Sequence, residues 1–226
     1  YLLTGPASFA YDLQGAFEGI DGTLLFVALA VVFIILLVVY RSPFLPFIVL
    51  FTSMAALSVA ILVVYYLAAN DIVQLNGQVQ GILFILVIGA ATDYSLLYVA
   101  RYREELTNHE RTWHATLAAV KSSVEPIIAA GGTVIAGLLC LLVSDLGSNK
   151  ALGPVGSVGI IFSITAALTF LPALLLAFGR TAFWPRRPKH APDQVHHDYQ
   201  KNHPAWNKVG QFVQRHPRRI WVSCTV

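Results

Sequence analysis

Charged residues are scarce in this chain. Lys, Arg, Asp and Glu make up only 12% of its 226 residues, while 56% are hydrophobic. A typical soluble domain carries about 25% charged residues, so this composition excludes an ordinary soluble protein. Cysteine is scarcer still, because Cys140 and Cys224 are the only two. Two cysteines exclude a disulfide framework, and we interpret both as small apolar residues.

The hydrophobic residues are present in blocks of roughly twenty, the length that crosses a ~30 Å hydrocarbon core as a helix. We therefore predict an all-α fold, a polytopic membrane helix bundle. A signal-peptide pattern is missing at Tyr1, and we expect the chain to be a piece of a longer one. The apolar blocks predict five complete spans, at about 22–40, 44–68, 81–100, 127–143 and 155–178, and the start of a sixth at Ile220.

The basic residues predict how the bundle is oriented. Fourteen of the 15 Lys and Arg residues fall in connections that lie on one side of the predicted membrane, and Lys150 is the exception. Basic loops stay in the cytoplasm, so this side is predicted to be cytoplasmic and to include residues 181–216. Residues 1–21 contain three acidic residues and no basic one, and we place them outside. Because topology explains the basic residues, we predict no nucleic-acid partner.

One acidic residue, Asp93, lies inside the apolar block 81–100. A carboxylate at bilayer depth is costly to keep ionised, so its presence is a hypothesis about ion or proton handling. No Lys or Arg lies at the same depth in any complete span. Removal from water favours the neutral acid, and the simplest interpretation is a carboxyl that binds and releases a proton. The hydroxyl of the next residue, Tyr94, can hydrogen-bond an acid or a base.

Helical periodicity places Gly89, Ala90, Leu96 and Leu97 on the same stripe as Asp93. Small residues allow a neighbouring helix to approach closely in a membrane. We therefore expect helix packing around Gly89 and Ala90, and we expect Asp93 to face the protein interior.

A structural role is the alternative for both polar residues. Asp93 could join helices by hydrogen bonding to a hydroxyl, and Tyr94 could be an ordinary packed aromatic residue. The spans offer four hydroxyl partners for Asp93, namely Ser53, Ser58, Ser163 and Thr165. A serine, threonine or asparagine could do the same without a titratable group.

Several stretches together resemble the bacterial MMPL transporters (mycobacterial membrane protein large) of the resistance–nodulation–division superfamily. They are Gly89-Ala-Ala-Thr-Asp93-Tyr94, its continuation to Leu106 through Arg101-Tyr-Arg103-Glu-Glu105, Gly131-Gly-Thr133, Leu168-Thr-Phe-Leu-Pro172 and Phe183-Trp184-Pro185. The resemblance covers nearly the whole chain.

The resemblance implies one half of a twelve-helix transporter, from the second to the sixth transmembrane helix with the start of the seventh. Residues 1–21 would be the end of an extracytoplasmic porter domain. Residues 22–180 would be the helix bundle, 181–216 a cytoplasmic basic linker with a possible amphipathic helix, and 217–226 the start of the next helix. The family's proton-relay pair maps onto Asp93 and Tyr94, and a second pair belongs to the remaining half of the transporter. The block of five helices is also similar to sterol-sensing domains.

Other segments are predicted to support the bundle. We expect a short interfacial helix over 112–120 and a start of the fourth span at Glu125-Pro126. Trp184 and the basic cluster after it suit the headgroup zone and its anionic lipids. The polar stretch 190–203 contains several histidines, but their spacing fits no closed ligand set, so we predict a tether and no metal site.

We therefore expect export of lipids or other lipophilic molecules across the bacterial cytoplasmic membrane, driven by the proton-motive force. Protons would be the coupling ion, and no cofactor is expected. The alternative is a non-transporting lipid- or sterol-sensing domain, which has no need of a titratable group at mid-depth. An intramembrane aspartyl protease needs two facing acids, and only Asp93 occurs at depth, so we predict no enzyme.

Overall fold

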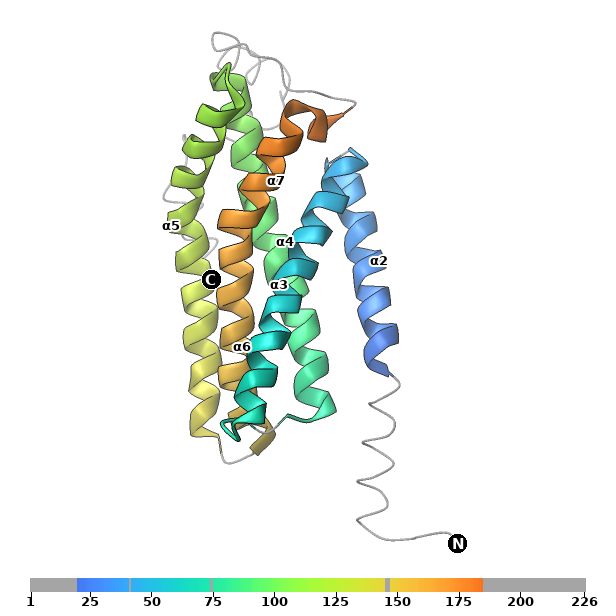
Figure 1. Cartoon of the computed structure of the whole chain (residues 1–226), viewed down its shortest axis with the longest axis vertical. Coiled ribbons are helices and arrows are strands. Elements are labelled where there is room, and N and C mark those ends of the chain that lie inside the picture. Colours follow the sequence, from blue (N-terminus) through green and yellow to red (C-terminus); the bar gives the residue numbers. More distant parts are fainter. Residues whose placement is uncertain (1–19, 41, 74, 145–146, 185–226) are drawn as a thin grey trace, which may run out of the picture.

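The computed structural model describes residues 20–40, 42–73, 75–144 and 147–184, and within them all regular structure is helical. Figure 1 shows long helices running up and down side by side. The all-α membrane helix bundle predicted from the sequence is confirmed. In chain order its elements are α2 (Ile20–Tyr40), α3 (Phe44–Ala69), α4 (Gly77–Asn108), α5 (Thr112–Leu139), the 3-10 turn η1 (Cys140–Val143), α6 (Gly147–Thr165), the π-helical turn η2 (Ala166–Phe170), α7 (Leu171–Phe178) and the 3-10 turn η3 (Gly179–Phe183).

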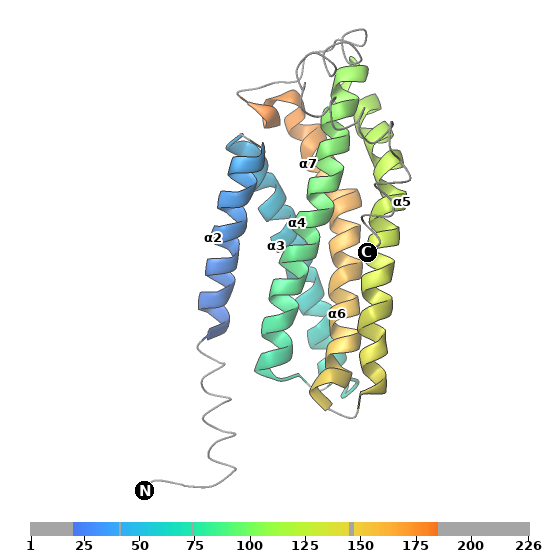
Figure 2. The ribbon, with the colours of Figure 1, turned by 180° about the vertical axis from the view of Figure 1, so that it is seen from behind.

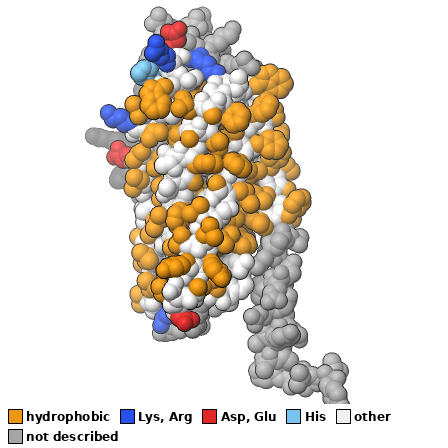
Figure 3. All heavy atoms as spheres, viewed as in Figure 1, with side chains coloured by type: hydrophobic (Ala, Val, Ile, Leu, Met, Phe, Trp, Pro, Cys, Tyr) orange, Lys and Arg blue, Asp and Glu red, His pale blue; other side chains and the backbone are white. Residues whose placement is uncertain are grey.

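Four stretches in the described part are long and apolar enough to cross a membrane: Phe44–Ala69, Gly77–Asn108, Thr112–Val143 and Asn149–Phe183. In α2 the stretch Leu25–Tyr40 forms a shorter apolar helix. Large apolar side chains cover the outside of the bundle, as the space-filling view in Figure 3 shows. A soluble protein rarely exposes so continuous an apolar surface, so the chain is a multi-pass membrane protein.

Charged residues mark the two ends of this apolar surface (Figure 3). The end at which α2, α4 and α7 finish and α3 and α5 begin is called the basic end below (Figures 1 and 2). This end is the one that the sequence predicts to be cytoplasmic. Its described cations are Arg101, Arg103, Arg111, Lys121 and Arg180.

Helix α4 lies at the centre of the packing, since it contacts α3, α5 and α6 as well as α2. Its N-terminus is capped by Asn76, whose side chain accepts a hydrogen bond of 2.8 Å from the backbone N–H of Val79. The buried face of α4 takes part in both apolar clusters of the core. Leu83, Val87 and Ala91 belong to one cluster, and Tyr94, Tyr98, Tyr102 and Leu106 belong to the other.

Two helix boundaries differ from the prediction, and both involve proline. Helix α5 is continuous from Thr112, so the separate interfacial helix over 112–120 is wrong, and Pro126 lies inside the helix instead of at its start. Helix α6 begins at Gly147, with Pro154 inside it. Proline is tolerated within membrane helices because neighbouring groups satisfy the carbonyl that it leaves free. The π-helical turn η2 ends directly before Leu171-Pro172, where proline removes another backbone donor.

Some predicted segments fall outside the described residues. They are the outer segment up to residue 19, the basic linker from residue 185 to 216, and the start of the next helix at 217–226.

Candidate functional site

Asp93 lies near the middle of α4, and its side chain is exposed on the surface of the bundle of five helices, in which α6, η2 and α7 count as one continuous helix. The expectation that it faces the interior is not met within the described bundle. The buried face of α4 is the neighbouring one, which carries Ala91, Thr92, Tyr94 and Ser95. Among the described residues, no ion pair or hydrogen bond engages the Asp93 carboxyl. The site therefore contains an exposed carboxyl at mid-helix that no described side chain pairs with.

Gly89, one helical turn before Asp93, also lies on an open face. A Cβ placed on Gly89 would meet no atom within 4 Å, so no described helix approaches it closely. Ala90 is half-buried and packs against the apolar cluster that contains Tyr94. Close packing around Gly89 therefore does not occur between the five helices described here. The exposed face of α4 continues along Ile82, Ile85, Leu96, Leu97 and Ala100.

Tyr94 points the other way, into the bundle, and only 5% of it is exposed. Its hydroxyl oxygen lies 3.2 Å from the position that a Cβ would take at Gly131 of α5. The same Cβ would lie 2.3 Å from the Cδ1 of Ile164 in α6. Gly131 therefore leaves the space that the Tyr94 ring and Ile164 occupy between α5 and α6. Asp93 and Tyr94 are adjacent in sequence but face an open surface and a packed interior, respectively.

Glycines of α6 allow α6 and α4 to approach each other closely. A Cβ at Gly159 would lie 2.6 Å from the Cγ2 of Val87. One turn further along, the hydroxyl of Ser163 donates to the carbonyl oxygens of Gly159, at 2.8 Å, and of Val87, at 3.3 Å. The sequence carried a signal for this contact that we did not use, because glycine recurs at every third position from Gly153 to Gly159. Small residues at such spacing are typical of close helix packing in membranes.

The structural alternative for Asp93, a hydrogen bond to a neighbouring hydroxyl, is not found among these helices. Each of the four hydroxyls considered donates to the carbonyl four residues earlier in its own helix. They are Ser53, Ser58, Ser163 and Thr165. The hydroxyl of Thr92, directly before Asp93, does the same and donates to the carbonyls of Ile88 and Gly89, each at 2.8 Å.

Towards the basic end, the face of α4 that carries Tyr94 continues through two buried tyrosines. The rings of Tyr98 and Tyr102 stack with centroids 6.1 Å apart and planes 11° from parallel. The Tyr102 hydroxyl donates to the carbonyl of Leu175 in α7 at 3.3 Å. This column fixes the rotation of α4 about its own axis, and that rotation sets the direction in which Asp93 points.

Beyond the column, one arginine joins the last helix to the end of α4. The guanidinium Nη2 of Arg180 donates to the carbonyls of Leu106, His109 and Glu110 at 3.2, 2.9 and 3.1 Å. The last carbonyls of a helix lack partners within it, and Arg180 satisfies them from η3. The histidines of 190–203 lie outside the described residues.

Comparison with known proteins gives one family. The model of the MMPL family matches residues 2–220. A membrane protein of Streptomyces coelicolor is 50% identical over 219 residues, which cover 97% of this chain and 30% of that protein. The apo-petrobactin exporter of Bacillus anthracis is 35% identical and is matched over 83% of this chain and 25% of its own length. The sulfolipid-1 exporter MmpL8 of Mycobacterium tuberculosis is 30% identical, with coverage of 82% and 17%. The chain thus spans less than a third of the length of these relatives.

Proposed function

The chain belongs to the MMPL family, and from that premise we propose that the full-length protein containing it exports lipids or other lipophilic molecules across the bacterial cytoplasmic membrane. Two of the relatives described above are named as exporters, of apo-petrobactin and of sulfolipid-1. The single observation that carries the proposal for these helices is the Asp93 carboxyl, exposed at mid-helix and free of any ion pair among the described residues.

We further propose that Asp93 and Tyr94 are the proton relay that couples export to the proton-motive force. A group that never changes its charge could be replaced by a neutral polar residue at lower cost in the membrane. Moving one proton through a potential of ~100 mV releases about 2.3 kcal/mol. That energy supports a concentration ratio of roughly fiftyfold, so one proton per cycle is a useful driving force.

The partner that the relay requires is proposed to come from further helices of the same transporter. Asp93 lies on an open face with half-exposed apolar neighbours such as Ile85 and Leu97. If a second helix bundle covers this face, the carboxyl becomes buried and the space beside Gly89 receives a neighbouring helix. The position of Tyr94 does not change when the second bundle covers this face, because its ring is buried inside the bundle described here.

Replacement of Asp93 by asparagine tests the relay. A strain that lacks the gene would be complemented with the full-length wild-type protein, with Asp93→Asn or with Glu125→Gln, and the lipid-soluble compounds in the medium would be compared. We expect the compounds lost from the deletion strain to return with the wild type and with Glu125→Gln, which removes an acid from the same bundle. We expect Asp93→Asn to leave them at the level of the deletion strain at equal membrane abundance. Full export by Asp93→Asn would contradict the relay.

A sensor without transport activity predicts a different result. Deletion of the gene would then change the regulation of other proteins, and no lipid-soluble compound would disappear from the medium. That outcome would overturn export itself, whereas export by Asp93→Asn would overturn only the role of Asp93.

A further inference from the structure

Four hydroxyls are buried in the bundle and have no hydrogen-bond partner among the described residues. They belong to Tyr40, Ser95, Tyr98 and Ser123. Most buried polar side chains have a partner, which is either another protein group or an ordered water molecule. An unpaired hydroxyl is costly in an apolar interior, so a group of four indicates that a polar ligand binds here.

All four hydroxyls lie on one side of Asp93, towards the basic end. Ser95 and Tyr98 follow Asp93 on α4, which finishes at that end. Tyr40 is the last residue of α2, which finishes there too. Ser123 lies in the first half of α5, which begins there. The hydroxyls therefore occupy the part of the bundle between the level of Asp93 and the end that the sequence predicts to be cytoplasmic.

Tyr98 faces a limited stretch of α5. One turn nearer the basic end, the Tyr102 hydroxyl interacts with the side chain of Thr116 in α5. One turn further from that end, the Tyr94 hydroxyl lies against Gly131. The three tyrosines share one face of α4, so Tyr98 lies opposite the part of α5 between these two contacts.

Ser123 is the buried hydroxyl residue of that stretch. The buried residues one turn before and after it, Ala119 and Ile127, belong to the same apolar cluster as Tyr98. Ser95 precedes Tyr98 by three residues, a spacing that makes two side chains neighbours on a helix. The hydroxyls of Ser95, Tyr98 and Ser123 thus gather between α4 and α5.

A small polar molecule can supply the missing partners. Ser95 and Tyr98 are 0% exposed and Ser123 is 1% exposed, so a helix added to the outside of the bundle cannot reach their oxygens. Water can, since a buried water molecule typically makes about three hydrogen bonds to polar groups that otherwise lack them.

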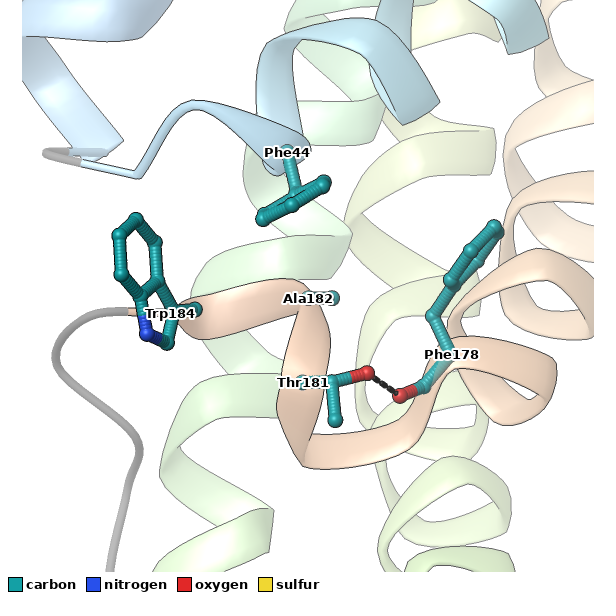
Figure 4. A pocket seen from close by; sticks show the side chains of 5 residues that line it. All are labelled: Phe44, Phe178, Thr181, Ala182 and Trp184. Carbon is teal, nitrogen blue, oxygen red and sulfur yellow. Dashed lines mark hydrogen bonds between the residues drawn. The ribbon is translucent and has the colours of Figure 1, made fainter.

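The pocket at the basic end, shown in Figure 4, has a different character. It is lined by Phe44, Phe178, Thr181, Ala182 and Trp184. Its one hydroxyl, that of Thr181, donates to the carbonyl of Phe178. Because apolar cavities stay dry, we expect water at the hydroxyls between α4 and α5 and not in this pocket.

We propose that the hydroxyls of Ser95, Tyr98 and Ser123 bind internal water that carries protons between the relay and the basic end. A hydroxyl both donates and accepts a hydrogen bond. It passes its proton to water on one side and takes up a proton from water on the other, so one proton crosses and the hydroxyl is regenerated. Tyr40 continues the route towards the basic end. The water site stands by itself, whereas its role in proton transfer rests on the proposed relay.

Radiolytic labelling tests the water site. X-rays convert bound water into hydroxyl radicals, which oxidise the side chain beside it, so a buried tyrosine is labelled where water touches it. The full-length protein would be equilibrated in isotopically labelled water, irradiated briefly and analysed by tandem mass spectrometry. Tyr102 is the matched control, because it is equally buried and its hydroxyl donates to a carbonyl. We expect Tyr98 to be labelled several times more than Tyr102, and Ser123→Ala to lower the labelling of Tyr98.

Removal of single hydroxyls tests the role in proton transfer. Full-length Tyr98→Phe, Ser123→Ala and Ser123→Thr would be compared in the deletion strain at equal membrane abundance. We expect the first two to slow export about fivefold, the factor that the loss of one hydrogen bond supplies. Ser123→Thr keeps a hydroxyl and should export like the wild type. Ser58→Ala removes an exposed hydroxyl that bonds its own helix and should change nothing.

Each part of the proposal has its own contrary result. Equal labelling of Tyr98 and Tyr102 would overturn the water site. Wild-type export by Tyr98→Phe and Ser123→Ala would overturn the proton route, as would equal slowing by Ser123→Ala and Ser123→Thr, since packing would then be the cause. Full export by Asp93→Asn would contradict the relay and leave the labelling of Tyr98 unchanged, so the two failures are distinguishable.

Discussion

At the scale of single residues, Gly131 of α5 is a position near Tyr94 where a side chain has no room. A Cβ at Gly131 would lie 2.3 Å from Ile164 Cδ1 and 3.2 Å from the hydroxyl oxygen of Tyr94. The neighbouring Gly132 has nothing within 4 Å of the same position. The two adjacent glycines therefore differ, and of the two only Gly131 borders the Tyr94 hydroxyl.

Substitution of these glycines by alanine measures that difference. Gly131→Ala should lower the free energy of unfolding by about 1–3 kcal/mol, the usual cost of an overpacked core. Gly132→Ala should leave it unchanged or raise it by roughly 0.5–1 kcal/mol, because alanine favours helix over glycine. Thermal unfolding of the full-length protein in one detergent checks both variants. Equal stabilities would show that Ile164 moves aside without cost.

The sequence singles out Asp93 as a candidate but does not predict what surrounds it. Asp93 was recognisable because a lone acid interrupts an apolar block, and that signal needs no structure. The close helix packing expected at Gly89 is not found among the described helices, and the glycines with the shortest contacts are Gly131 and Gly159. A single sequence shows that small residues are present, but which helix approaches them depends on the packing of the whole bundle.

At the scale of the helices, the end of α4 is held by Arg180. Its guanidinium donates to three carbonyls between Leu106 and Glu110. The carbonyls at the end of α4 and in the turn to α5 thereby gain a charged donor, and hydrogen bonds to charged groups contribute about 1.5–3 kcal/mol each when partly shielded from water.

Arg180→Lys should loosen this end of the molecule while leaving the charge in place. All three carbonyls accept from one nitrogen, Nη2. The ammonium nitrogen of lysine lies one bond closer to the backbone and is more strongly hydrated, so we expect it not to reach the three carbonyls as Nη2 does. We expect amide hydrogen exchange in residues 105–112 to become about tenfold faster, which corresponds to about 1.4 kcal/mol. Arg103→Lys, at an exposed position on α4, is the matched control and should not change this exchange. Unchanged exchange in Arg180→Lys would mean that α5 alone holds the turn.

Helix boundaries that depend on local sequence were predictable, whereas a boundary that depends on packing between helices was not. The turns at Pro43 and at Asn76-Gly77 were predictable because proline and an asparagine cap act locally. Pro126 was misinterpreted as a helix start, yet α5 continues through it. Nothing local identifies a proline that a membrane helix accepts, because the groups that compensate for it belong to other helices or to the side chains around it.

At the scale of the whole molecule, the bundle has two kinds of exposed apolar surface. The outer faces of α2 and α3 carry large side chains such as Phe26, Leu62 and Tyr65, which are 68–72% exposed. The open face of α4 combines Asp93 and the unoccupied space at Gly89 with Leu96 and Leu97, which are only 37% and 41% exposed. The first surface suits lipid, whereas a carboxyl and a glycine suit contact with protein.

Spin labels distinguish the two surfaces in the full-length protein. With the native cysteines replaced by serine, a nitroxide would be attached at Leu97→Cys on the α4 face or at Leu62→Cys on the outer face of α3. Oxygen dissolves in lipid, so we expect frequent collisions with oxygen at position 62. At position 97 we expect several-fold fewer collisions and an immobilised spectrum, because under our proposal further helices cover the face that carries Asp93. The same label at both positions in the isolated 226-residue chain provides the control, since position 97 should then become as accessible as position 62. Equal accessibility in the full-length protein would show that Asp93 faces lipid, and no partner for the relay could then lie across that face.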